Sequence, residues 1–156
     1  MDKATVVGIF TAPEERAPVQ AHSEVHAVPG RGLEGDRYYK AAGDPAERDP
    51  AKEVTVISSE GLERARDEHG LQLDPGEHRR NIVTRGIEVT DLIGKEFSIG
   101  EVRLRALEDN PPCRYLEEVT GKKLLKPLIR DGGIRAQILN EGTIRLGDDV
   151  AELGVP

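Results

Sequence analysis

Short apolar runs rich in β-branched residues, each ended by glycine or proline, restrict the fold of this chain more than any other feature. Runs of about four to eight such residues are typical of β-strands and too short for most helices. The 17 glycines and 10 prolines among the 156 residues supply turns between the runs. We expect strands at residues 5–10, 21–28 and 54–57, around residues 82–83, within residues 97–107 and at residues 134–139, and a strand, a turn and a further strand over residues 143–150.

Helices are few in this pattern. Ser58 or Ser59 can cap a helix that runs through residues 61–69, and Gly70 is placed to end it. Residues 115–119 predict a second, shorter helix. Strands and helices do not alternate as they do in a parallel sheet, so the helices belong to connections between strands.

The turns complete the expected architecture. Gly100-Glu101 is a two-residue hairpin turn between alternating runs, and Gly147-Asp148 repeats its glycine-then-acid pattern. Residues 38–52 are polar, contain two prolines and predict a long surface loop. We therefore expect a mainly β fold, a single domain over residues 1–156 with a barrel-like mixed sheet and a few short helices in its connections.

The charge of the chain is acidic overall but unevenly distributed. The net charge is −7, whereas residues 78–135 carry 12 Lys and Arg against 9 Asp and Glu. Acidic flanks repel a long polyanion, so the pattern argues against nucleic acid and favours an anionic small molecule as the ligand of the basic segment.

The first residues predict the location of the protein. Residues 1–10 lack a basic segment, a long apolar run and a small-residue cleavage site, and no run in the chain is long enough to cross a membrane. A single cysteine cannot form an internal disulfide, which agrees with a reducing compartment. We expect a cytoplasmic protein without membrane contact.

The only cysteine, Cys113, follows two prolines and precedes Arg114. The prolines fix the backbone before the thiol, and the arginine favours the thiolate. Cys113 is therefore the candidate catalytic residue, as nucleophile, sulfur carrier or soft metal ligand. The alternative is a small buried apolar residue without chemistry. Nothing local chooses among these roles.

Arg79-Arg80-Asn81 lies at the entrance of an expected strand. The arginines are either solubilising edge charges or a fork for a phosphate or carboxylate, and Asn81 can offer a donor and an acceptor to a ligand. Arg135 adds positive charge if the fold brings it near. The four histidines lack the spacing of a zinc site, and no phosphate-binding loop is present.

Several motifs occur in an order that resembles the MOSC domain, which is named for the C-terminal domain of molybdenum cofactor sulfurases. They are Gly32-Leu33-Glu34-Gly35-Asp36, the segment from Pro75-Gly76 to Arg79-Arg80-Asn81-Ile82, Pro112-Cys113, and the segment from Gly133-Ile134-Arg135-Ala136 to Gly147-Asp148. The similarity extends over roughly residues 8–153.

The resemblance implies a β-rich, barrel-like fold and a molybdopterin-type molybdenum cofactor, with Cys113 as molybdenum ligand. It implies a cofactor contact at Arg80-Asn81, and we place Asp36, Arg79, Arg114 and Arg135 in the same site. Larger relatives bind the cofactor, and some reduce N-hydroxylated compounds. The function expected is a reductase-type or cofactor-handling protein, with an electron-transfer protein or a cysteine desulfurase as partner. The alternatives are a sulfur transferase that uses a Cys113 persulfide and a non-catalytic anion-binding module with a structural cysteine.

Overall fold

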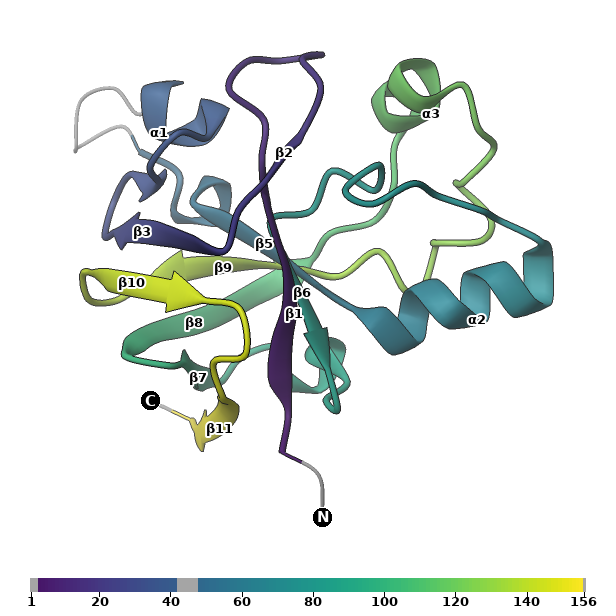
Figure 1. The fold of residues 1–156 in the computed structure, drawn as a ribbon. Helices are drawn as coiled ribbons and strands as arrows, with labels where there is room; N and C mark the ends of the chain where they lie inside the picture. The colour runs from purple at the N-terminus through teal and green to yellow at the C-terminus, as the bar shows by residue number, and fades with distance from the viewer. Residues whose placement is uncertain (1–2, 42–47, 156) are drawn as a thin grey trace.

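The computed structural model describes residues 3–41 and 48–155, and most of its elements are β-strands (Figure 1). The strands are β1 (Thr5–Thr11), β2 (Gln20–Ala21), β3 (Glu24–Val28), β4 (Gly32–Leu33), β5 (Val54–Ser58), β6 (Ile82–Arg85), β7 (Glu96–Ile99), β8 (Val102–Asp109), β9 (Ile134–Ile138), β10 (Gly142–Arg145) and β11 (Val150–Gly154). The helices are α1 (Arg37–Ala41), α2 (Ser59–His69) and α3 (Arg114–Thr120), with 3-10 turns η2 (Pro50–Lys52) and η3 (Val89–Leu92).

Eight of the strands form one mixed sheet in the order β11-β7-β8-β9-β5-β6-β1-β2. Strands β5 and β6 pair in parallel, and the other neighbours pair antiparallel. A smaller sheet has the order β10-β3-β4. The prediction of a mainly β fold with a mixed sheet is confirmed.

The large sheet curls into a half-barrel because β1 also bonds to the turn that precedes β11. The amide of Val6 donates to the carbonyl of Asp148 at 3.0 Å, and the amide of Gly147 donates to the carbonyl of Val6 at 2.8 Å. The amide of Val150 donates to the carbonyl of Ala4 at 2.8 Å. The segment at the β11 edge is thereby joined to β1, the strand next to the opposite edge, which gives the barrel-like shape expected from the sequence.

The main core fills this half-barrel. In β8 the residues Val102, Leu104 and Ala106 are buried and alternate with more exposed neighbours. This alternation places one face of each strand against the core. The predicted hairpin is confirmed, since Gly100-Glu101 joins Ile99 of β7 to Val102 of β8 as paired residues.

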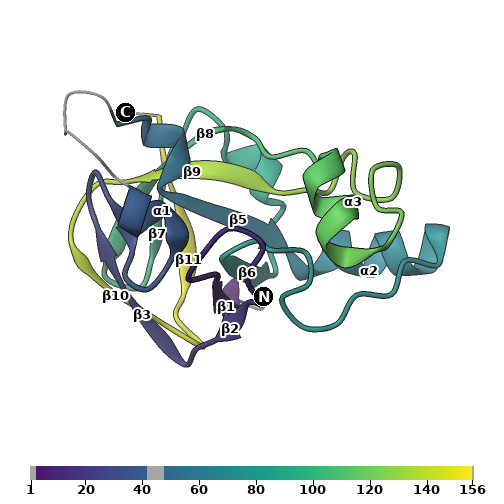
Figure 2. The ribbon, with the colours of Figure 1, turned by 90° about the horizontal axis from the view of Figure 1, so that it is seen from above.

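A second, smaller core lies outside the sheet, under α2 and α3. Its buried members are Ala65, Leu71, Leu116, Leu124 and Leu128. In two perpendicular views α2 and α3 lie on one side of the molecule and α1, β3 and β10 on the other (Figures 1 and 2). No helix in residues 3–41 or 48–155 combines the length and apolar character needed to cross a membrane.

The boundaries of α2 are those predicted. The Ser58 hydroxyl accepts a hydrogen bond from the amide of Gly61 at 3.2 Å and so caps the helix. Gly70 ends it in the left-handed conformation, with φ of 68°. Both groups satisfy backbone atoms that a helix leaves without partners.

Two predictions about the first third of the chain are wrong in part. Residues 21–28 are not one strand, because the chain leaves β1 at His22, whose amide donates to Ile9, and joins β10 at Ser23, whose carbonyl accepts from Leu146. The expected loop over residues 38–52 overlaps α1 and η2, and residues 42–47 lie outside the described part. Helix α1 begins after Asp36, because Oδ2 of its carboxylate accepts a hydrogen bond from the backbone amide of Tyr38 in the first turn.

Candidate functional site

A cavity of about 690 Å³ opens beside the end of β1. Its walls come from segments that are distant in sequence: residues 10–15, residues 36–38, residues 79–81, and Asn110, Pro111, Cys113, Tyr115 and Leu116. Volumes of about 300–1,000 Å³ are usual for small-molecule sites. Six of the predicted site residues line this cavity, namely Asp36, Arg79, Arg80, Asn81, Cys113 and Arg135.

Cys113 precedes α3 and is exposed. Its carbonyl accepts the amide of Leu116 at 3.0 Å, which starts the helix. Its thiol lies at the wall of the cavity rather than in either core. The interpretation of Cys113 as a small buried apolar residue is therefore wrong.

Arg80 is buried and bound to backbone carbonyls. Its Nε donates to Gly132 at 2.8 Å and its Nη2 donates to Asn110 at 2.7 Å. The pKa of Arg80 is lowered to about 10, chiefly by burial and next by the nearby Arg135, whereas Cys113 opposes the shift. A group with this pKa stays charged at neutral pH. The edge-charge interpretation is wrong for Arg80, because it is a buried cation in the cavity wall.

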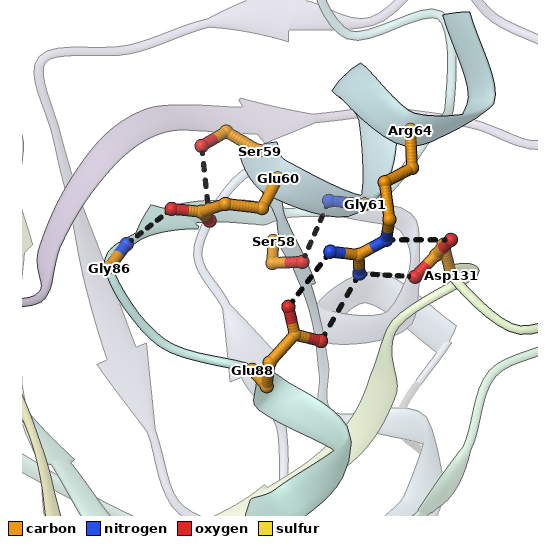
Figure 3. Close-up of polar contacts among 8 residues, drawn as sticks. All are labelled: Ser58, Ser59, Glu60, Gly61, Arg64, Gly86, Glu88 and Asp131. Atoms are coloured by element: carbon orange, nitrogen blue, oxygen red, sulfur yellow. Dashed lines mark hydrogen bonds and ion pairs between the residues drawn. The ribbon is translucent and has the colours of Figure 1, made fainter. Parts of the chain in front are cut away.

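The loop that supplies the Gly132 carbonyl is attached to α2 by ion pairs (Figure 3). Nη2 of Arg64 lies 2.7 Å from Oδ1 of Asp131, and Nη1 lies 3.0 Å from Oε1 of Glu88. One guanidinium thus joins α2 to the loop before β9 and to the start of η3. This clamp fixes the backbone that holds Arg80.

The same loop packs closely against the segment that precedes the cysteine. The amide of Asn110 donates to the carbonyl of Gly133 at 2.9 Å. A Cβ atom on Gly132 would lie 2.5 Å from the carbonyl oxygen of Asn110 and 3.2 Å from Pro112. Only glycine permits this approach, so the loop sets the position from which Cys113 is presented.

Arg79 differs from Arg80 because part of its guanidinium has no partner. Nη1 donates to the carbonyl of Ala17 at 2.6 Å. Nε and Nη2 are buried and form no hydrogen bond with the described residues. Its backbone has a φ of 61°, which is uncommon for a residue with a side chain. Unpaired donors beside a cavity are suited to an anion.

Tyr115 is a site residue that the sequence reasoning missed. Its hydroxyl accepts hydrogen bonds from the amide of Arg16 at 2.9 Å and from Nη1 of Arg37 at 2.8 Å. Three guanidiniums lie near its ring, at 5.2 Å for Arg16, 5.4 Å for Arg37 and 6.0 Å for Arg79. A usable signal was the scarcity of aromatic residues, since two of the three tyrosines, Tyr38 and Tyr115, line the cavity.

Asn81 has a structural role. Its Oδ1 accepts the amide of Thr55 at 3.0 Å and the Thr55 hydroxyl at 3.1 Å, and its Nδ2 donates to the carbonyl of Phe10 at 3.0 Å and to Asp36 at 3.4 Å. The amide therefore joins β1, β5 and β6, and we correct the expectation that it offers both a donor and an acceptor to a ligand.

Burial raises the pKa of Asp36, although the Ala12 amide opposes the shift.

The remaining arginines divide between the cavity and the surface. Arg135 lines the cavity, with its Nε 3.8 Å from Glu108. Arg114 is exposed and does not line it, so this predicted site residue is not brought to the others. The inner wall carries Arg37, Arg79, Arg80 and Arg135, while the acidic side chains of residues 14 and 15 lie on the exposed rim.

The chain by itself does not offer a metal site in the described ranges. Residues 3–41 and 48–155 contain no group of three or more His, Cys, Asp or Glu side chains that could hold a metal ion.

Three solved structures of bacterial proteins have a similar fold. The YuaD protein from Bacillus subtilis superposes with a TM-score of 0.79 at 17% identity, covering 96% of this chain and 94% of that one. YiiM from Geobacillus stearothermophilus gives 0.69 at 15% identity, with 96% and 75% covered. YiiM from Escherichia coli gives 0.65 at 17% identity, with 96% and 69% covered. At these identities the likeness concerns the fold alone.

The sequence comparison is more specific. No curated protein matches the chain. Residues 34–151, which include the elements from α1 to β10 and most of the cavity wall, match the family model of the MOSC domain. The match extends over more than half of the chain, and the chain therefore belongs to the MOSC domain family.

Proposed function

We propose that this chain binds a molybdopterin-type cofactor in the 690 Å³ cavity, with Cys113 as a ligand to molybdenum. The observation that carries the proposal is the joint presence of an exposed thiol and four arginines in one cavity. The cofactor is a phosphate-bearing pterin dithiolene, so it contains both the anion that arginines bind and the metal that a thiolate binds.

The residues present fit such a group. Nε and Nη2 of Arg79 are buried donors without a partner in the described part of the chain, and a buried donor left unpaired costs about 1–3 kcal/mol. A phosphate oxygen can accept from both, because a guanidinium presents its donors as a planar fork. Arg80 and Arg135 add positive charge without blocking the cavity.

Each protein group has a defined part in this proposal. When bound, the cofactor supplies a redox-active molybdenum ion. Arg79 and Arg135 bind its anionic portion, and Arg80 provides a fixed charge from the wall. Cys113 supplies a thiolate at the opening, where an electron-transfer protein can approach. We therefore assign the chain to molybdenum-cofactor-dependent oxidoreductases or to proteins that handle the cofactor.

Two matched arginine variants and one cysteine variant test this proposal. The chain and its Arg79→Gln, Arg114→Gln and Cys113→Ser variants are purified from a host that makes the cofactor, and molybdenum is measured by plasma mass spectrometry. We expect bound metal in the wild type and in Arg114→Gln, and loss of about tenfold or more in Arg79→Gln, as charged hydrogen bonds are removed. No molybdenum in any preparation, or an unchanged content in Cys113→Ser, would refute it.

A sulfur carrier is the second candidate, and the exposure of Cys113 favours it. Transfer of sulfane sulfur from a cysteine desulfurase requires that the accepting thiolate reach the partner's persulfide, which an exposed cysteine allows. Mass spectrometry after incubation with a desulfurase and cysteine distinguishes the two. A gain of one sulfur atom at Cys113, removed by a reductant, supports the carrier function, whereas an unmodified Cys113 rejects it.

A further inference from the structure

A second cavity, of about 620 Å³, lies on the other side of Phe10. It opens between β1, α2 and the connector over residues 71–76, and it shares only Phe10 with the first cavity. Its apolar lining includes Val7, Phe10, Leu62, Leu71, Leu73 and Val83. This volume is within the usual range for a small-molecule site.

One polar side chain in this lining is buried and has a free donor. Nδ1 of His78 accepts the backbone amide of Arg80 at 2.9 Å. A neutral imidazole that accepts at Nδ1 carries its proton at Nε2. The pKa of His78 is lowered to about 3, chiefly by burial and next by the charge of Arg80, so the ring is neutral at physiological pH. Nε2 makes no hydrogen bond with residues 3–41 and 48–155, and it is not among the fully buried atoms, so a ligand can reach it.

The charged groups around this cavity do not call for a charged ligand. Lys122 binds Glu77, with Nζ to Oε1 at 2.6 Å, and Glu63 binds Arg85 at 2.8 Å. Asp74 is exposed in the lining and repels a carboxylate. Arg66 also lines the cavity and binds Asp67 at 3.1 Å, and the uncharged Ser59 and Gln72 are not buried. Among the buried residues of this lining, the cavity therefore offers an apolar wall and one neutral N–H group, that of His78.

We propose that this second cavity binds an uncharged, mostly apolar small molecule that carries one carbonyl-type oxygen, which accepts a hydrogen bond from Nε2 of His78. A carbonyl satisfies the free donor, and the hydrocarbon part covers the leucine and valine side chains. The proposal goes beyond the cofactor site and does not require it. The cavities share a wall at Phe10, and His78 also holds the backbone of Arg80, so the two sites are adjacent.

Butyrophenone and butylbenzene test the proposal, because they differ only by a carbonyl in place of a methylene. Each is titrated into isotope-labelled protein and followed by NMR of methyl groups and of the His78 ring. We expect butyrophenone to shift the methyl signals of Leu62, Leu73 and Val83 and the Nε2–H signal of His78. Butylbenzene should bind about fivefold more weakly, the difference expected for one net hydrogen bond.

Three variants make the test specific. His78→Asn keeps an oxygen where Nδ1 accepts the Arg80 amide, and its Nδ2 donor is too short to reach the position of Nε2, so the variant should lose the preference for butyrophenone. Val7 is 47% exposed at the cavity and Leu146 is 46% exposed outside both cavities. Val7→Trp should weaken butyrophenone about tenfold or more by filling the opening, whereas Leu146→Trp should have no effect.

The outcomes separate clearly. Shifts confined to the second cavity, with a preference for the ketone that His78→Asn removes, support the site. Absence of binding, equal binding of the two compounds to the wild type, or shifts centred on Cys113 and Arg135 in the first cavity would overturn it.

Discussion

Replacing Asn81 by alanine should destabilise the protein strongly, because the side chain bonds to buried backbone groups. Without the amide, the N–H of Thr55 and the carbonyl of Phe10 lose partners that lie at 3.0 Å, and Asp36 loses a donor. A buried backbone group left unpaired costs about 1–3 kcal/mol, so two such groups predict a loss of about 2–6 kcal/mol. This is a large part of the roughly 5–15 kcal/mol that stabilises a domain.

Asn140 provides the matched control. Its Oδ1 accepts the amide of Arg103 at 2.6 Å and its Nδ2 donates to the carbonyl of Glu101 at 3.0 Å, but these bonds are exposed. Water can replace them, so Asn140→Ala should cost about 1 kcal/mol or less. Urea unfolding measures both values, and a loss of about 4 kcal/mol moves the midpoint by about 2 M if the slope is near 2 kcal/mol/M. Equal losses in the two variants would refute a structural role for Asn81.

Three further predictions concern pH, a glycine and the clamp on α2. The lowered pKa of His78 means that the unfolded chain binds a proton below its ordinary value of 6.5 while the folded chain stays neutral until about 3. The free energy of unfolding should therefore decrease by about 1.4 kcal/mol for each unit by which the pH is lowered between these values, relative to His78→Asn. Urea unfolding at pH 4 to 7 measures this change. Gly133→Ala should cost at least about 3 kcal/mol in the same assay, because φ is 94° and the new Cβ meets backbone atoms, whereas Gly70→Ala, with open space around it, should cost about 1. Phosphate bound by the arginines of the first cavity should slow the alkylation of Cys113 by iodoacetate. Arg64→Ala frees Asp131 and its loop and should weaken this protection several-fold; unchanged protection would contradict the anchoring role.

The sequence predicted the elements whose signals are local. The cap at Ser58 and the stop at Gly70 give α2 its limits, and two residues between alternating runs give the β7–β8 hairpin. These features depend on residues that are near one another in the chain. The break in the expected strand over residues 21–28 was missed because it results from a change of partner strand, from β1 to β10, which no local pattern records.

The candidate site was predictable in its residue types but not in its contacts. Charge and the single cysteine pointed to Arg79, Arg80 and Cys113, and all of them line the cavity. Tyr115 was missed because its role depends on Arg16 and Arg37, which are distant in sequence. Whether an arginine has donors free for a ligand, as Arg79 does, or binds backbone carbonyls, as Arg80 does, depends on which carbonyls lie near it in the folded structure.

The strand order explains why a cation can be buried at this site. Strand β8 ends beside the start of β9, since Asp109 pairs with Ile134. The carbonyls of Asn110 and Gly132, just outside this pair, are the ones that bind Arg80. The arginine thus satisfies acceptors that the sheet leaves open, so its removal should affect folding whether or not a ligand is bound.

Arg79 is in the opposite situation, since two of its nitrogens lack acceptors in the described structure. Its removal relieves unpaired donors and should leave stability nearly unchanged while it weakens anion binding. A comparison of Arg79→Gln with Arg80→Gln therefore separates binding from folding at neighbouring positions. Both the free energy of unfolding and the protection of Cys113 by phosphate are measured on the same samples. Arg79→Gln should lose mainly protection, whereas Arg80→Gln should lose mainly stability. A large loss of stability in Arg79→Gln, with phosphate protection intact, would show that its guanidinium serves the fold and not the ligand.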